Sequence, residues 1–186
     1  MPHVFDFEHV EILESDERKS IQPPDPLVDL ILKIFPRGRR NVSCEIGPGA
    51  GHFTFSLARL FDRVYVIEVN EEMMNYLRKK TEKANITNIH FILSASPPPM
   101  AERVNLALFS DVLHELDRPE EYLEWAFENC EVVVVIDWKK KNMPLGPPVE
   151  ERVSESRARS MLLNAGFSVE PNNVYPCHYM CVGRKS

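Results

Sequence analysis

The feature that most constrains this chain is a glycine-rich segment between a short apolar run and an apolar helical pattern. The apolar run covers residues 42–46 and carries an acid near its end; Gly47, Gly49 and Gly51 follow at every second position, and helical spacing begins at Phe53. Glycine has no Cβ, so such a loop can adopt left-handed backbone angles and let a ligand lie against the main chain. The free N–H groups of the next helical turn suit a carboxylate or phosphate. The segment therefore predicts a strand, a ligand-binding loop and a helix.

Strands and helices alternate along most of the chain. β-Branched and apolar runs predict strands at 42–46, 64–70, 89–93, 104–109 and 132–136, followed by two short strands near 167–174 and 179–182. Apolar residues at helical spacing predict helices around 27–34, 53–61, 73–77, 122–127 and 158–165. The run Val132 to Ile136 is apolar throughout, which is typical of a central strand covered on both faces. The alternation predicts a three-layer α/β domain with a mainly parallel sheet.

Polar residues mark several helix starts. We expect Asp25 to cap a helix that begins at Pro26, Asn70 to cap the helix containing Met73, and Ser154 to cap the last helix. Gly166 is expected to end that last helix.

Composition narrows the class of protein. The chain has 186 residues, of which 44% are hydrophobic, and its formal charge is −6. We expect one domain over 1–186, with an amino-terminal arm and helix at 1–40 and the α/β core at 41–186. The negative charge argues against broad, sequence-independent binding to nucleic acid. No apolar run approaches the length of a membrane span, and the four cysteines form no C-x-x-C pair, so we expect a reduced, cytoplasmic protein.

An acid ends the second predicted strand. Two parallel strands joined by a helix bring their carboxyl ends to one edge of a sheet, so Glu68 should lie beside the glycine loop. A carboxylate there can accept two hydrogen bonds from a ribose diol.

The glycine segment resembles a known motif. A dinucleotide site calls for G-x-G-x-x-G, whereas this loop is G-x-G-x-G. Glu45-Ile-Gly-Pro-Gly-Ala-Gly51 resembles the first motif of class I S-adenosylmethionine-dependent methyltransferases. The likeness extends over 41–185 and includes the segment 109–116. The overall pattern is most similar to the branch that contains the ubiquinone and menaquinone biosynthesis methyltransferases.

This resemblance implies a fold, a cofactor and a set of contacts. The fold would be a Rossmann-like methyltransferase fold with a mainly parallel seven-stranded sheet and an antiparallel carboxyl-terminal strand. The cofactor would be S-adenosylmethionine, with S-adenosylhomocysteine as product. Its methionine part would contact Glu45, Gly47, Pro48, Gly49 and Gly51; its ribose and adenine would contact Glu68 and Val69; its sulfonium end would lie between Ser110 and Leu113. Ser94 and Ala95 stand where many relatives have an aspartate facing the adenine, so adenine recognition here is expected from Ser94 or from backbone groups.

His114 is the candidate catalytic residue. Transfer from a sulfonium mainly requires alignment, but a hydroxyl or acidic-carbon acceptor benefits from a base whose pKa lies near the operating pH. A packed or helix-capping role is the alternative interpretation of His114. The pair His114-Glu115 does not extend to H-E-x-x-H, so a zinc-protease interpretation fails and no metal site is expected.

The methyl acceptor is left open by the sequence. We expect a small molecule, and Phe5, Phe7 and Trp138 suggest an apolar or aromatic one. Three alternatives remain: a nucleic-acid or protein methyltransferase of the same fold, a non-catalytic cofactor-binding protein, and, more distantly, a nicotinamide oxidoreductase. Phe109-Ser-Asp-Val112 lacks the Asn/Asp-Pro-Pro-Tyr motif of amino-methylating enzymes.

Overall fold

The computed structural model describes residues 6–185, and Phe5 therefore lies outside the described part of the chain. Seven strands form one sheet in the order β3-β2-β1-β4-β5-β7-β6. The strands are β1 Val42–Ile46, β2 Arg63–Glu68, β3 Ile89–Leu93, β4 Val104–Ser110, β5 Cys130–Trp138, β6 Ser168–Pro171 and β7 His178–Arg184. Strands β1 to β5 pair in parallel, whereas β7 pairs antiparallel with both of its neighbours, β5 and β6. The predicted mainly parallel sheet with an antiparallel last strand is confirmed.

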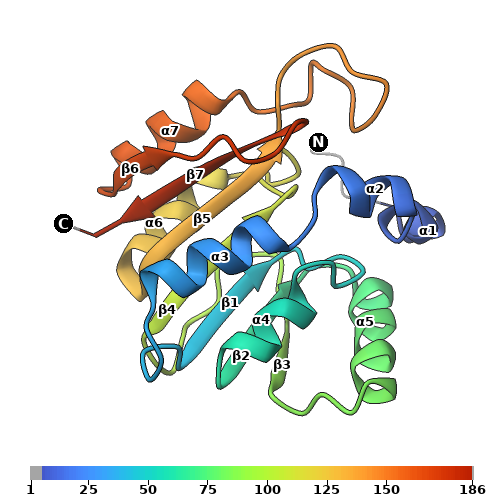
Figure 1. Ribbon diagram of the computed structural model, residues 1–186, viewed down its shortest axis with the longest axis vertical. Helices are drawn as coiled ribbons and strands as arrows, with labels where there is room; N and C mark the ends of the chain where they lie inside the picture. Colours follow the sequence, from blue (N-terminus) through green and yellow to red (C-terminus); the bar gives the residue numbers. More distant parts are fainter. Residues whose placement is uncertain (1–5, 186) are drawn as a thin grey trace.

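Helices cover both faces of this sheet (Figure 1). They are η1 Phe7–His9, α1 Val10–Leu13, α2 Asp16–Ile21, α3 Asp25–Ile34, α4 Thr54–Leu60, α5 Glu71–Lys83, α6 Pro119–Asn129 and α7 Glu155–Asn164. Buried side chains of α3, α4 and α5 form one apolar cluster against the sheet, and those of α6 and α7 form a second. The three-layer arrangement follows from the two apolar faces of the sheet, each of which must be removed from water. None of the helices in residues 6–185 is long and apolar enough to cross a membrane.

The register of the parallel strands sets where the site can lie. Ile46 of β1 is opposite Ile67 of β2 on one side and Phe109 of β4 on the other. Phe109 is in turn opposite Val135 of β5. The residues just beyond these positions therefore emerge together at one edge of the sheet, as parallel pairing requires.

The helix caps agree with the sequence in two cases and differ in one. Asn70 accepts hydrogen bonds from the backbone N–H groups of Glu72 and Met73, and Ser154 accepts one from Arg157. The expectation for Asp25 was wrong: α3 begins at Asp25 itself, with Pro24 at the cap position and no side-chain cap bond. A Pro24-Asp25-Pro26 run already restricts the backbone before the helix, so the helix starts one residue earlier than the capping pattern suggests.

The cap at Asn70 yields the first prediction. Asn70→Ala should lower the free energy of unfolding by about 1 kcal/mol, because two N–H groups at the start of α5 lose their acceptor. Urea denaturation followed by circular dichroism would measure it. Asn70→Ser is the matched control, since serine can still cap, and equal losses in both variants would contradict the capping role.

Candidate functional site

A large cavity lies at the carboxyl ends of β1, β2, β4 and β5. Its volume is about 810 Å³, within the range of roughly 300–1,000 Å³ that is usual for small-molecule and cofactor sites. The glycine loop, the ends of β2 and β4, α1, α2 and the segment 145–151 all contribute to its walls. Ten of the twelve residues expected at the site line this cavity: Glu45, Gly47, Pro48, Gly49, Glu68, Val69, Ser94, Ala95, Ser110 and His114.

The glycine loop forms one wall because its first two glycines have left-handed backbone angles. Gly47 has φ 62° and Gly49 has φ 52°. A Cβ on Gly47 would lie 2.5 Å from Val112 Cγ2, so any larger residue would displace the neighbouring loop. Gly51 has a different role: it does not line the cavity, and a Cβ there would lie 2.5 Å from Leu77 of α5. Gly51 therefore allows close packing of α5 instead of ligand contact.

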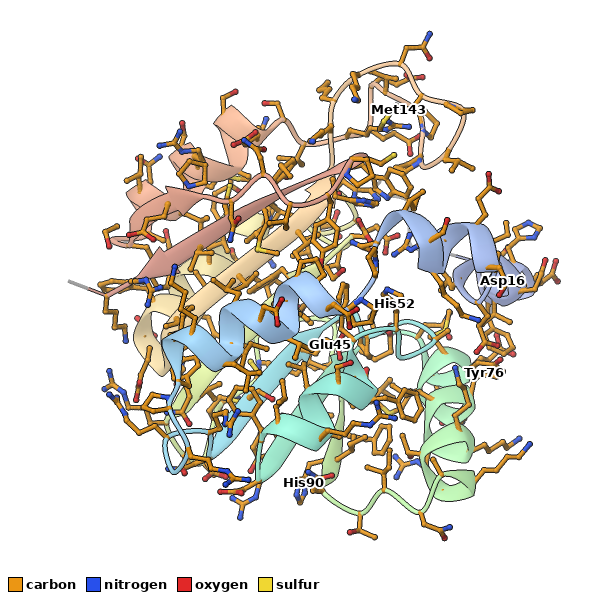
Figure 2. The ribbon with its side chains drawn as sticks, viewed as in Figure 1. Asp16, Glu45, His52, Tyr76, His90 and Met143 are labelled. Carbon is orange, nitrogen blue, oxygen red and sulfur yellow. The ribbon has the colours of Figure 1, made fainter. Side chains whose placement is uncertain are left out.

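Glu45 lies beneath this loop, near the centre of Figure 2. The side chain is buried, and Thr54 Oγ1 donates a hydrogen bond of 2.6 Å to its Oε2. Burial raises the pKa of Glu45 to about 8, against a smaller opposing effect of the Thr54 hydroxyl. Without a bound cation, the carboxyl group is thus mostly protonated at neutral pH.

Glu68 and Val69 form the wall on the β2 side. The Oε1 atom of Glu68 accepts hydrogen bonds from the backbone N–H groups of Val69 at 2.8 Å and Asn70 at 2.9 Å. Burial raises the pKa of this carboxyl group, and these N–H groups oppose the rise. Val69 is 49% exposed although it is apolar. The carboxylate is thus held in a fixed orientation beside an uncovered apolar side chain.

Three other expected positions, Ser94, Ala95 and Leu113, differ in whether their side chains face the cavity. Ser94 Oγ donates a hydrogen bond of 2.7 Å to the carbonyl oxygen of Ser96, which folds the segment after β3 onto itself. Ala95 is exposed at the cavity wall. Leu113, in contrast, is 1% exposed and packs in the core, whereas Val112 lines the cavity beside Ser110.

His114 is held by an acid of the next strand. Its Nδ1 lies 2.8 Å from Oδ1 of Asp137, which is completely buried at the end of β5, and its backbone N–H donates to Oδ2 at 3.3 Å. The ring therefore gives its Nδ1–H to the carboxylate, and Nε2 lies 3.9 Å from Glu115 Oε1. Burial lowers the pKa of His114, but the Asp137 carboxylate outweighs it and raises the pKa to about 9. Burial raises the pKa of Glu115 to about 7.

A second polar cluster joins α2, the end of β4 and β7. Arg18 of α2 forms an ion pair with Asp111, and His178 Nε2 lies 3.2 Å from the other oxygen of Asp111. Burial opposes ionisation, but the charges of Arg18 and His178 hold the pKa of Asp111 well below its ordinary value. Asp111 also has φ 52°, a left-handed conformation that is uncommon outside glycine. Neither Arg18 nor His178 occurs in a sequence motif, so sequence reasoning could not identify either of them.

The wall opposite the glycine loop depends on a buried guanidinium group. Arg152 is 2% exposed and has no acidic partner among the described residues; it donates to the carbonyl oxygens of Lys139, Lys141, Leu145 and Pro147. These bonds fold the segment after β5 into a compact turn. In this turn, a Cβ on Gly146 would lie 2.7 Å from the Trp138 ring, so the loop packs directly on the indole.

The amino-terminal arm covers the outer side of the cavity. Glu14 accepts hydrogen bonds from the Tyr76 hydroxyl and from Lys80, both on α5, and Lys80 also donates to the carbonyl oxygen of Ala50 at 2.6 Å. Figure 2 shows Tyr76 on the part of α5 that lies next to the arm. Leu13 and Arg18 line the cavity. The arm is therefore attached both to α5 and, through Asp111, to the end of β4.

The buried carboxyl group of Glu45 gives a prediction about pH. The folded-state pKa of about 8 lies above the ordinary 4.5, so folding favours the protonated form, and its stabilisation is complete below the ordinary value and lost as the pH rises toward 8. Without ligand, Glu45→Gln should melt at least about 3 °C above the wild type near pH 8, and the gap should close near pH 5. Thermal denaturation across this range would measure it. Glu124→Gln on the exposed face of α6 is the control, and a gap independent of pH would refute the assignment.

Comparisons with known proteins agree with this geometry. A family model described as "Methyltransferase domain" matches residues 44–134, from β1 into β5. A ribosomal RNA small subunit methyltransferase A of Mycoplasma mycoides is 33% identical over 60 residues, which is 32% of this chain and 23% of that relative. The chain thus spans only about a quarter of the length of this curated relative.

Two solved structures resemble nearly the whole chain. A SAM-dependent methyltransferase from Aquifex aeolicus is 26% identical, with a TM-score of 0.85 over 98% of this chain and 100% of that one. A putative type 11 methyltransferase from Sulfolobus solfataricus is 25% identical, with a TM-score of 0.70 over 89% of this chain and 94% of that one. Residues 44–134, which include the glycine loop and Glu68, are thus similar to a methyltransferase domain, and nearly the whole chain shares its Rossmann-like fold with S-adenosylmethionine-dependent methyltransferases.

Proposed function

We propose that this protein transfers a methyl group from S-adenosylmethionine to a small molecule whose accepting atom is a hydroxyl oxygen or an acidic carbon. One observation carries the proposal: a single cavity joins the glycine loop and Glu68 at one end to His114 and Glu115 at the other. A cofactor wall and an acid–base pair in one cavity are what transfer to a protonated acceptor requires.

The residues at the β2 end fit the cofactor. When bound, it supplies an electrophilic methyl group on a sulfonium. Glu68 would bind the ribose hydroxyls, since its carboxylate is already oriented by two backbone N–H groups. Val69 offers an exposed apolar surface to the adenine ring. Gly47 and Gly49 let the methionine part approach the main chain, and the buried carboxyl group of Glu45 lies beneath it.

The residues beyond the glycine loop suit the acceptor. Trp138, Tyr122 and Leu116 also line the cavity and offer apolar and aromatic surface. His114 lies at its edge with Nε2 not engaged by Asp137. A small acceptor is also what the resemblance to the ubiquinone and menaquinone biosynthesis branch suggests, and we include that branch in the proposal.

Titration calorimetry would test the cofactor site. S-adenosylmethionine and S-adenosylhomocysteine should each bind with micromolar affinity, and Glu68→Ala should weaken both at least about tenfold, since it removes an acceptor of two charge-assisted hydrogen bonds. Glu72→Ala, an exposed acid in the first turn of α5, is the matched control. Binding of NADH in place of the sulfur compounds would overturn the proposal.

A second candidate acceptor is RNA, because the Mycoplasma relative is a ribosomal RNA methyltransferase. The chain's charge of −6 and the acids Glu17, Glu115, Glu121 and Glu151 around the cavity oppose this candidate. We expect methyl label from the cofactor to enter a small-molecule extract and not total RNA. Label recovered in RNA would favour the second candidate.

A further inference from the structure

The best-defined polar arrangement outside the cofactor wall is the chain Asp137, His114 and Glu115. The three groups come from the ends of two adjacent parallel strands: Asp137 belongs to β5, and the other two follow β4. Asp137 is fully buried and already accepts the backbone N–H of Trp138 at 2.7 Å. The carboxylate thus cannot turn away from the imidazole without losing that bond.

Asp137 fixes which nitrogen of His114 faces the cavity. The 2.8 Å contact between Nδ1 and Oδ1 commits the ring's first N–H to the carboxylate. Nε2 is then the atom that can gain or lose a proton, and Glu115 is the carboxylate nearest to it, at 3.9 Å. His114 and Glu115 both line the cavity, so any ligand charge there acts on them directly.

The surroundings of the pair are mostly acidic. Besides the arginines and their partners named next, the titratable or charged groups that line the two cavities around the pair are Glu17, Glu45, His52, Glu68, Asp111, Asp117, Glu120, Tyr122, Lys140, Glu150, Glu151 and Arg157. Arg18 pairs with Asp111, and Arg118 pairs with Glu121. Arg152 gives its donors to backbone carbonyl groups. The excess of carboxylates stabilises a proton on the imidazole as long as no other cation enters.

We propose that Asp137 is a positioning residue, and that the His114–Glu115 pair releases its proton when a cationic cofactor fills the cavity and so becomes the base for the acceptor. The inference rests on the proposed function. Two positive charges in one poorly solvated cavity repel each other, so a sulfonium disfavours the imidazolium, whereas a neutral thioether does not. The pKa of His114 near 9 and that of Glu115 near 7 are consistent with a pair that holds this proton before loading.

The proton balance closes over one turnover. The acceptor atom forms its bond to the methyl carbon, the carbon–sulfur bond breaks with its electron pair left on sulfur, and the acceptor's proton passes to Nε2 of His114. The product in the cavity is then a neutral thioether, beside which the imidazolium is stable. The pair thereby returns to its initial protonated state.

The number of protons released when the cofactor binds tests this proton coupling, and the measurement does not require the acceptor to be known. Calorimetric titration of S-adenosylmethionine near pH 8, in phosphate and in Tris, gives the number of protons exchanged from the difference in ionisation heats. The wild type should release a large fraction of one proton more than His114→Gln. Subtracting the proton release of His114→Gln from that of the wild type removes any protonation change of the cofactor's own amine. With S-adenosylhomocysteine, the wild type and His114→Gln should release equal numbers of protons.

A second variant tests the positioning role of Asp137. Asp137→Asn keeps the size and an oxygen acceptor but removes the charge, so the imidazole should be neutral before loading and the extra proton release should vanish. S-adenosylhomocysteine binding should persist in this variant, and Glu124→Gln should behave as the wild type.

Three results would be decisive against parts of the scheme. Equal proton release in the wild type and His114→Gln, or equal release with both sulfur compounds, would overturn the proton-coupling inference alone. Unchanged release in Asp137→Asn would remove the positioning role. Failure of both compounds to bind the wild type would instead overturn the proposed function.

Discussion

Parallel pairing of β1 with β2 and β4, and of β4 with β5, is the constraint on which the site depends. The pairing leaves Glu68, the glycine loop, Ser110 and Asp137 at one edge of the sheet, although β1 ends at Ile46 and β5 ends only at Trp138. Neither half of the cavity could form alone. The β2 end offers groups that suit an adenosine, and the β4–β5 end offers groups that can exchange a proton. The hydrogen-bonded register holds the two at a fixed separation.

Buried ionisable groups are concentrated at that edge. Glu45, Asp111 and Asp137 would each be costly to bury as unpartnered ions. The cost of burial is offset differently for each group. Glu45 has a raised pKa and a hydroxyl partner. Asp111 contacts Arg18 and His178, and Asp137 contacts the imidazole of His114. The raised pKa of Glu45 makes it easily protonated, whereas the lowered pKa of Asp111 keeps that group ionised. One cavity edge therefore combines a group whose charge can follow that of a ligand with one whose charge is fixed.

Two walls of the cavity are built from segments outside the regular βα alternation. The arm is attached by Glu14 and Arg18, and the segment after β5 is organised by Arg152 around Trp138 (Figure 1, upper right). A sequence motif could identify neither. Arg152 is an ordinary arginine in a charged stretch until the fold places four carbonyl oxygens around it, and Arg18 lies on a short helix ninety-three positions from its partner Asp111.

The sequence by itself determined the strand and helix alternation, the glycine loop, and the placement of Glu68 and His114 at the carboxyl ends of their strands, because these depend on local periodicity and on a general property of parallel sheets. It could not show that Leu113 points into the core while Val112 lines the cavity, since that depends on the twist of the chain after Asp111. Nor could it show that Gly51 serves packing against Leu77. Only the tertiary structure paired His114 with Asp137, and Asp111 with Arg18 and His178. Such contacts arise from the order of the strands and from the path of the amino-terminal arm. Neither of these produces a periodic pattern in the sequence.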